Sequence, residues 1–319
     1  MILSIAAGFA LLFLGGELLV RGSVSAARQL GVSPLLIGVT LVGFGTSTPE
    51  LVTSIEAALR ESPGIAVGNV VGSNIANVLL ILGAAALIAP ISCDPRGLIR
   101  DGSAMVVATL AGVAVVLTGT MGRSAGFVFI ALLVSYITAA YLHDRKSRRA
   151  AAELEEREEE LARAVPGGLW LSLILAVAGI ATTVVGARFL VDGAIGFAVS
   201  FGISETVIGL SIVAVGTSLP ELATSLVAAA RRHGDIAFGN ILGSNVYNIF
   251  GILGITAAVH PLTIPPEIIK LDIWVMAAAA VLLIVFALTG SRISRSEGAI
   301  FLGGYAAYLG YLAATAGPL

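Results

Sequence analysis

The sequence "GTSTPELVTS" at Gly45–Ser54 recurs almost unchanged as "GTSLPELATS" at Gly216–Ser225. Each copy places a proline and a glutamate inside a long run of Leu, Ile, Val, Ala and Gly. A carboxylate in so apolar a segment is costly unless something compensates its charge, and such groups mark ion or substrate pathways. The repetition predicts that the two glutamates serve one purpose.

The composition around these motifs is that of a membrane protein. Of 319 residues, 57% are hydrophobic and 12% are charged, whereas soluble domains carry about 25% charged residues. The chain contains ten apolar runs near or above the length of about 20 residues that a membrane-crossing helix needs, and without water such runs are helical. The sequence therefore predicts an all-α membrane protein with ten transmembrane helices. The predicted spans are 2–20, 31–59, 65–89, 98–119, 123–142, 168–191, 202–230, 236–259, 270–289 and 296–315.

The distribution of basic residues predicts the topology. With ten alternating spans and the N-terminus outside, fourteen of the 18 Lys and Arg residues fall on the inner side. Because positive charge accumulates on the cytoplasmic side, both termini are expected outside and the central linker in the cytoplasm. Cys93 stands alone and the three histidines lie near predicted span ends, so neither a disulfide nor a histidine metal site is predicted.

A duplication organises the chain. When 30–83 is aligned with 201–254 at a constant offset of 171 residues, 27 of 54 positions are identical. Each half then carries five spans, and an odd number inserts the second half from the opposite side, as an inverted repeat. The expected divisions are a first five-helix half over 1–142, a cytoplasmic linker over 143–165, and a second five-helix half over 166–319. The polar linker is expected to form a short solvated helix.

An inverted repeat makes the two decapeptides one site. Glu50 and Glu221 each lie in the middle of the second span of their half, so the symmetry brings them face to face near the membrane midplane. Pro49 has no N–H and therefore releases the carbonyl of Gly45 from the helical ladder, and Pro220 does the same in the second copy. Released carbonyls at this depth are tolerated where they line a cavity or bind a cation.

The next helix of each half adds further oxygen atoms, in "GNVVGSNIAN" at Gly68–Asn77 and "GNILGSNVYN" at Gly239–Asn248. Glycines four residues apart let helices approach closely. Hydroxyl and amide side chains follow at the same spacing, namely Ser73, Asn77, Ser244 and Asn248. Oxygen donors beside two carboxylates suit a hard cation such as Ca²⁺, and the motifs contain no sulfur or imidazole for a softer metal.

The paired GTS-PE and GN--GSN---N segments resemble the two alpha-repeats of the sodium/calcium exchanger family, within the calcium/cation antiporters, in its prokaryotic form. The resemblance implies a Ca²⁺/Na⁺ antiporter of the inner membrane that works by alternating access, with the first and sixth spans sliding across the other helices. It implies that Glu50 and Glu221 bind Ca²⁺ with the backbone carbonyls of Thr46 and Thr217. The flanking Na⁺ sites would use the hydroxyls of Ser47, Ser218, Ser73 and Ser244 and the backbone oxygens of Gly43 and Ala214. Asn77 and Asn248 would line the centre.

The resemblance implies that the chain is not an enzyme and has no cofactor, and its partners are Ca²⁺, Na⁺ and the lipid bilayer, with no nucleic acid and no protein partner predicted. Several family members have aspartate where this chain has Asn248, which leaves ion stoichiometry and potassium dependence open. A Ca²⁺/H⁺ antiporter that protonates the same two glutamates is the alternative. The sequence has no HExxH motif or Ser/His pair for an intramembrane enzyme, and a channel would not account for the inverted duplication.

Overall fold

The computed structural model describes residues 2–155, 168–200 and 214–315, and these segments are helical except for short connections and four two-residue strands. Labels η denote π-helical turns. The elements of the first half are α1 (Ile2–Leu30), α2 (Pro34–Ile37), η1 (Gly38–Val42), α3 (Gly43–Thr46), α4 (Thr48–Leu59), α5 (Pro63–Ala76), η2 (Asn77–Leu82), α6 (Gly83–Ile88), β1 (Ile91–Ser92), α7 (Pro95–Gly97), η3 (Leu98–Gly102), α8 (Ser103–Leu117), β2 (Thr120–Met121) and α9 (Arg123–Glu155). Those of the second half are α10 (Gly168–Ser200), α12 (Ala214–Thr217), α13 (Leu219–Ala230), α14 (Gly234–Val246), η6 (Tyr247–Leu253), α15 (Gly254–Val259), β3 (Leu262–Thr263), η7 (Ile268–Asp272), α16 (Ile273–Leu288), β4 (Arg292–Ile293) and α17 (Arg295–Thr315).

Within the described residues, seven helices are long and apolar enough to cross a membrane, and the bent pair Pro34–Thr46 and Thr48–Leu59 raises the number to eight. These eight coincide with eight of the ten predicted spans. Of the other two, 202–230 falls partly outside the described residues, which resume at α12 and the apolar α13. The last predicted span forms the helix α17, but its glycines and tyrosines make it less apolar.

Three helices continue beyond the ends of their predicted spans. The first span continues ten residues further, to Leu30, because residues such as Gly22 and Gln29 pack against α10, and it stops at Gly31, whose φ of +62° ends the helix. The sixth likewise extends to Ser200. The fifth, α9, continues without a break to Glu155, so the first part of the linker prolongs this helix instead of forming a separate one. The rest of the predicted linker lies outside the described residues except at its end.

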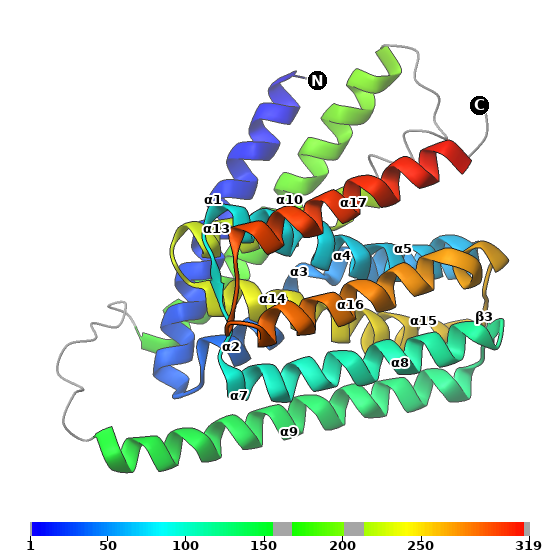
Figure 1. Ribbon diagram of the computed structural model, residues 1–319. Coiled ribbons are helices and arrows are strands. Elements are labelled where there is room, and N and C mark those ends of the chain that lie inside the picture. The colour runs from blue at the N-terminus through cyan, green and yellow to red at the C-terminus, as the bar shows by residue number, and fades with distance from the viewer. Residues whose placement is uncertain (1, 156–167, 201–213, 316–319) are drawn as a thin grey trace.

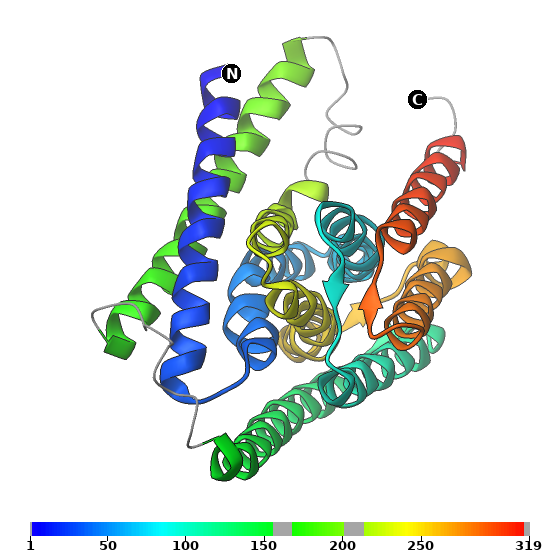
Figure 2. The same cartoon turned by 60° about the vertical axis from the view of Figure 1, so that its left-hand side comes forward.

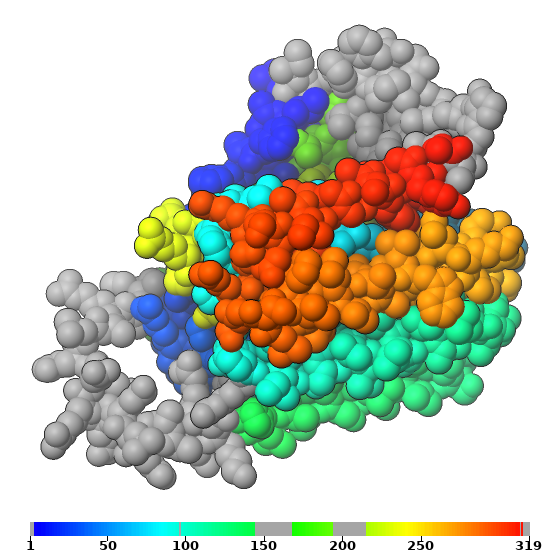
Figure 3. Space-filling model, viewed as in Figure 1, coloured from blue at the N-terminus to red at the C-terminus, as the bar shows by residue number. Residues whose placement is uncertain are grey.

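Two groups of helices make up the bundle. α1 and α10 lie side by side along one flank and cross the other helices at a steep angle (Figures 1 and 2). The spans Pro63–Ile88 and Gly234–Val259 form the centre, with 72% and 83% of their most apolar stretch buried, whereas this share is 22–39% in the other five unbroken spans. α8, α9, α16 and α17 lie next to one another and form the face seen in Figure 3.

Close backbone contact joins α1 to α10. Gly8, Gly15 and Gly22 recur every seventh residue, and a Cβ atom on any of them would lie 2.5–2.6 Å from a backbone nitrogen of α10. Gly179 and Gly186 present the same obstacle from α10 toward α1. Since no side chain larger than hydrogen fits, these five glycines (the glycine seam) allow the two helices to pack as one unit.

The two halves also exchange strands. β1 pairs with β4 of the second half, with Ile91 opposite Ile293, and β2 pairs with β3, with Met121 opposite Leu262. All four of these side chains are buried. Each half therefore supplies one strand to each of two ribbons, and the ribbons connect the halves outside the central pair of spans.

Candidate functional site

Each decapeptide breaks its helix at the serine. Ser47 has φ −81° and ψ 11°, and Ser218 has φ −89° and ψ 8°, both outside helical geometry. In the first half the two helical pieces meet at an angle of 44°. The proline two residues later lies in the first turn of the new helix, where its missing N–H is tolerated. The glutamate follows it in the same turn, so the positive end of the helix dipole stabilises its carboxylate.

The two glutamates are bridged across the halves. Glu50 and Glu221 are each 1% exposed. Ser47 Oγ donates a hydrogen bond to Glu221 Oε1 at 2.7 Å, and Ser218 Oγ donates one to Glu50 Oε1 at 3.1 Å. Each broken helix therefore contacts the carboxylate of the other, as a face-to-face arrangement requires. Ser218 Oγ also lies 3.3 Å from Ser73 Oγ on α5.

Four buried side-chain oxygen atoms of the predicted site residues have no hydrogen-bond partner among the described residues. They are Glu50 Oε2, Glu221 Oε2, Asn77 Oδ1 and Asn248 Oδ1. Buried polar atoms are rarely left unsatisfied, and each exception needs an explanation such as an ion. Two carboxylate and two amide oxygens are ligands that a hard cation accepts. No cluster of three or more His, Cys, Asp or Glu side chains occurs in the described ranges, so the acidic donors here are two.

The other predicted residues lie on the pieces of the two broken helices, or on α5, α14 and the π-helical turns that follow these two helices. Ser244 Oγ donates to the carbonyl of Gly43 at 3.2 Å, which joins α14 to α3. Thr46 is buried and its hydroxyl donates to the Val42 carbonyl at 3.0 Å. For Ala214 the structure gives only its place as the first residue of α12, beside a stretch outside the described residues. Asn248 is buried without a side-chain bond to the other predicted residues.

Both asparagines coincide with a change in helix type. π-helical turns begin at Asn77 and at Tyr247, directly before Asn248. Single π-helical turns within α-helices are frequent at functional sites, because they redirect side chains and release backbone carbonyls. The predicted close packing of glycines is confirmed in α14 at Gly239, where a Cβ would lie 2.5 Å from the Leu35 carbonyl oxygen. It is not seen in α5 at Gly72, where a Cβ would have no described atom within 4 Å.

Two asparagines that the sequence analysis did not single out support the glutamates. Asn69 donates to the Glu50 carbonyl at 3.1 Å and to Ser54 Oγ at 2.9 Å. Asn240 donates to the Glu221 carbonyl at 3.4 Å and to Ser225 Oγ at 2.9 Å. Their side-chain oxygens lie 3.4 Å from the hydroxyls of Thr217 and Thr46, each in the other half. Their presence in both GN motifs was the available signal.

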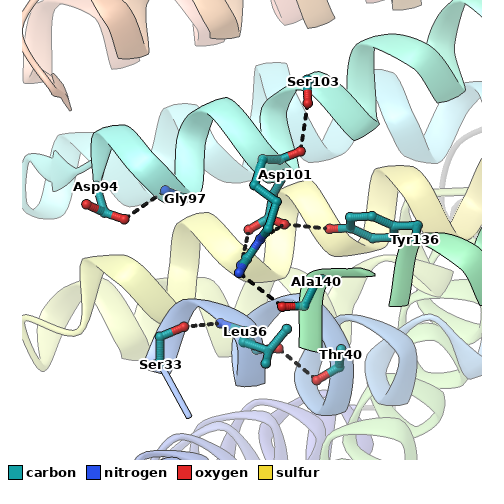
Figure 4. A network of polar contacts seen from close by, with 10 residues as sticks. Ser33, Leu36, Thr40, Asp94, Gly97, Asp101, Ser103, Tyr136 and Ala140 are labelled. Carbon is teal, nitrogen blue, oxygen red and sulfur yellow. Dashed lines mark hydrogen bonds and ion pairs between the residues drawn. The ribbon is translucent and has the colours of Figure 1, made fainter. Parts of the chain in front are cut away.

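A buried carboxylate elsewhere in the bundle shows the contrast. Asp101 is fully buried, yet Arg100 binds both of its oxygens at 2.8 and 2.7 Å, and Tyr136 of α9 donates to it at 3.1 Å (Figure 4). Arg100 also donates to the carbonyl of Ala140 at 3.3 Å. Since its charge is paired and its oxygens are bonded, this group fastens η3 to α9 and offers nothing to a ligand.

The whole chain matches known transporters. The family described as "Sodium/calcium exchanger protein" matches residues 1–142 and 171–314. The sodium/calcium exchanger MaX1 of Methanosarcina acetivorans is 34% identical over 333 residues, covering 95% of each chain. The chain belongs to the sodium/calcium exchanger family.

Other proteins are similar to this chain over nearly its whole length. The inner membrane protein YrbG of Escherichia coli is 36% identical, covering 96% of this chain and 94% of its own. Among solved structures, one of the sodium-calcium exchanger NCX_Mj superposes with a TM-score of 0.82 at 32% identity, covering 98% of both chains. The predicted family is thereby confirmed. The chain is an integral, multi-pass, helical membrane protein of a family that transports cations, including Ca²⁺, by antiport.

Proposed function

We propose that this chain exchanges Ca²⁺ for Na⁺ by alternating access, with the ions bound between the two repeats near the membrane midplane. The observation that carries the proposal is the set of four buried oxygens that have no hydrogen-bond partner among the described residues, to which each repeat contributes one glutamate and one asparagine. The hydrogen bonds between Ser47 and Glu221 and between Ser218 and Glu50 hold the two contributions together.

The donor set has the number and chemistry that Ca²⁺ needs. Ca²⁺ takes six to eight oxygen ligands, from carboxylates, carbonyls and amides. The two glutamates and two asparagines offer four, and the carbonyls of Thr46 and Thr217 at the two helix breaks add neutral ones. The flanking Na⁺ ions would use the remaining predicted oxygens, which are those of Ser47, Ser218, Ser73, Ser244, Gly43 and Ala214.

Charge explains why such a site exchanges ions. Two carboxylates are neutralised by one Ca²⁺ or by two Na⁺, and a third Na⁺ leaves the loaded site with one positive charge. Moving that charge across the membrane is worth about 2.3 kcal/mol per 100 mV. The empty, doubly negative site is too costly to move through the apolar region, whereas the loaded forms can move. Coupling between the two ions follows from this difference.

The proposed architecture is ten spans arranged as two inverted five-helix repeats, over 1–142 and 166–319. Matched contacts at the offset of 171 residues support it: Ser47 with Glu221 corresponds to Ser218 with Glu50. The exchanged strand pairs obey the same symmetry. With the basic residues counted above, this arrangement has both termini outside and the linker over 143–165 in the cytoplasm of a prokaryote.

α1 and α10 are proposed to move together across the other helices. The glycine seam makes them one rigid unit, and at one end Gln29 donates to Ser25 and Ser172, which joins them further. Their contact with the rest of the bundle includes an ion pair, Glu17 with Arg231, at 2.7 Å. Among the described residues, the unit has strong internal contacts and few polar contacts to its surroundings, which suits a sliding motion.

Purified protein in vesicles provides the test. An outward-directed Na⁺ gradient (Na⁺ inside the vesicles) at constant pH should drive ⁴⁵Ca²⁺ uptake, an inward-directed one should drive ⁴⁵Ca²⁺ release from loaded vesicles, and a pH gradient without Na⁺ should do neither. Uptake driven by the pH gradient alone would assign the chain to Ca²⁺/H⁺ exchange through the same glutamates. A Glu56→Gln variant, altered at an exposed glutamate paired with Arg60, serves as the control and should transport like the parent.

A further inference from the structure

The asparagine side chain has two ends of opposite character. Its Oδ1 atom can bind a cation, whereas its Nδ2 group carries two N–H donors and repels one. Asn77 lies 1% exposed at the candidate site and its Oδ1 is one of the four partnerless oxygens. Something must therefore decide which end of Asn77 faces the ions.

A short chain of buried side chains makes that decision. Asn77 Nδ2 donates to Asn245 Oδ1 at 3.2 Å, and Asn245 Nδ2 donates to Met105 Sδ at 3.6 Å. Asn245 is 3% exposed and Met105 is fully buried. A thioether sulfur can accept a hydrogen bond but cannot donate one. Met105 thus fixes the direction of Asn245, and Asn245 in turn keeps the N–H groups of Asn77 away from the ion site.

The repeat symmetry is broken at this point. The counterpart of Asn245 at the offset of 171 residues is Asn74, which is equally buried at 3%. Asn74 instead donates to the carbonyl of Val70 in its own helix, at 2.7 Å. The counterpart of Met105 is Met276, also buried, which accepts no side-chain hydrogen bond from a described residue. Among the described residues, Asn77 is oriented by such a chain of hydrogen bonds, and its counterpart Asn248 is not.

We propose that Asn245 and Met105 are positioning residues that orient the amide of Asn77 so that its oxygen faces the transported cations. This inference rests on the proposed function, in which Asn77 belongs to the ion site. It predicts an effect on ion affinity, because an amide that is free to rotate spends part of its time with its N–H groups toward the cation. Expression and folding are not its main readout.

The first comparison uses Asn245→Ala with Asn74→Ala as the matched control. Na⁺-driven ⁴⁵Ca²⁺ uptake in vesicles should show the half-saturating Ca²⁺ concentration raised about tenfold for Asn245→Ala, the scale of one hydrogen bond to a charged group. The maximal rate and the half-saturation of Asn74→Ala should stay near those of the parent. Equal half-saturation for the two variants would overturn the proposal.

The second comparison separates orientation from packing. A carboxylate at position 77 presents oxygen at both ends and has no N–H group for Asn245 to turn away from the ions, so Asn245→Ala should not raise half-saturation further in an Asn77→Asp background. The same penalty in both backgrounds would mean that Asn245 acts only by filling space. Met105→Leu keeps the side-chain volume but removes the hydrogen-bond acceptor, so it should raise half-saturation, whereas Met276→Leu should not. If Asn77→Asp is inactive, the comparison of these two variants distinguishes orientation from packing. If the parent itself shows no Na⁺-driven uptake, the proposed function fails. The positioning role is then tested by measuring transport of the cation that the parent does carry in the same set of variants.

Discussion

Replacing one glutamate by glutamine tests the central charge argument most directly. In Glu50→Gln the side chain keeps its shape and an oxygen that can still accept the hydrogen bond from Ser218, now 3.1 Å from Glu50 Oε1. The negative charge alone is lost. Because Glu50 is only 1% exposed, bulk water compensates little of that loss.

The size of the effect follows from Coulomb's law. Two unit charges about 4 Å apart attract one another by about 4 kcal/mol at an effective dielectric constant of about 20. Without this carboxylate, the site attracts one Na⁺ less strongly by about this amount, and one Ca²⁺ less strongly by about twice this amount. The difference, about 4 kcal/mol, corresponds to a fall of about a thousandfold in the preference for Ca²⁺ over Na⁺. Ca²⁺ flux at ordinary concentrations should therefore nearly vanish, while expression remains largely intact.

The assay is ⁴⁵Ca²⁺ uptake into vesicles over a wide range of external Ca²⁺ and internal Na⁺. Glu221→Gln, whose carboxylate accepts from Ser47 at 2.7 Å, should behave in the same way, and Glu56→Gln should not differ from the parent. Near-normal flux in either buried variant would remove that glutamate from the ion site. Equal losses of Ca²⁺ and Na⁺ affinity would refute the charge argument even if transport fell.

Three further predictions concern pH, topology and packing. Asn248→Asp adds a titratable group beside two carboxylates. The protonated aspartic acid resembles the asparagine of the parent, and the charge appears as the pH rises, so the Na⁺-driven Ca²⁺ fluxes of variant and parent should diverge with rising pH. Superimposable pH profiles would place Asn248 outside the site. A cysteine at Ala152 should react with an impermeant maleimide only from the cytoplasm, and labelling of intact cells would contradict the topology. The background is low because burial raises the pKa of Cys93 to about 12, which keeps its thiol protonated and unreactive. Gly15→Ala should lower the free energy of unfolding in detergent by about 1–3 kcal/mol, as overpacking does, because its Cβ would lie 2.5 Å from an α10 backbone nitrogen. Gly310→Ala, whose Cβ would have no described atom within 4 Å, serves as the control and should not change it. Equal melting temperatures for the two variants would mean that the glycine seam is not tightly packed.

The sequence by itself determined the membrane environment, the helical class, the family and the pairing of the two glutamates. These follow from local properties: the lengths of apolar runs, the positions of Pro49 and Pro220, and an offset that is constant over 54 positions. A repeated motif also implies a repeated environment, so one copy predicts what surrounds the other. For this reason most of the candidate site was accessible before any coordinates.

Only the tertiary structure decided which atoms meet across the halves. The bond from Ser47 to Glu221 spans 174 residues, and that from Asn77 to Asn245 spans 168. No local pattern encodes such contacts, because they depend on how helices far apart in the chain cross. The same holds for helix ends in apolar segments: α1 continues to Leu30 because packing against α10 stabilises it, although hydropathy alone marked an earlier end. The break of symmetry between Asn245 and Asn74 is likewise invisible in two identical GSN motifs. It arises because the surroundings of the two asparagines differ, and a side-chain amide turns toward whichever acceptor its neighbours provide.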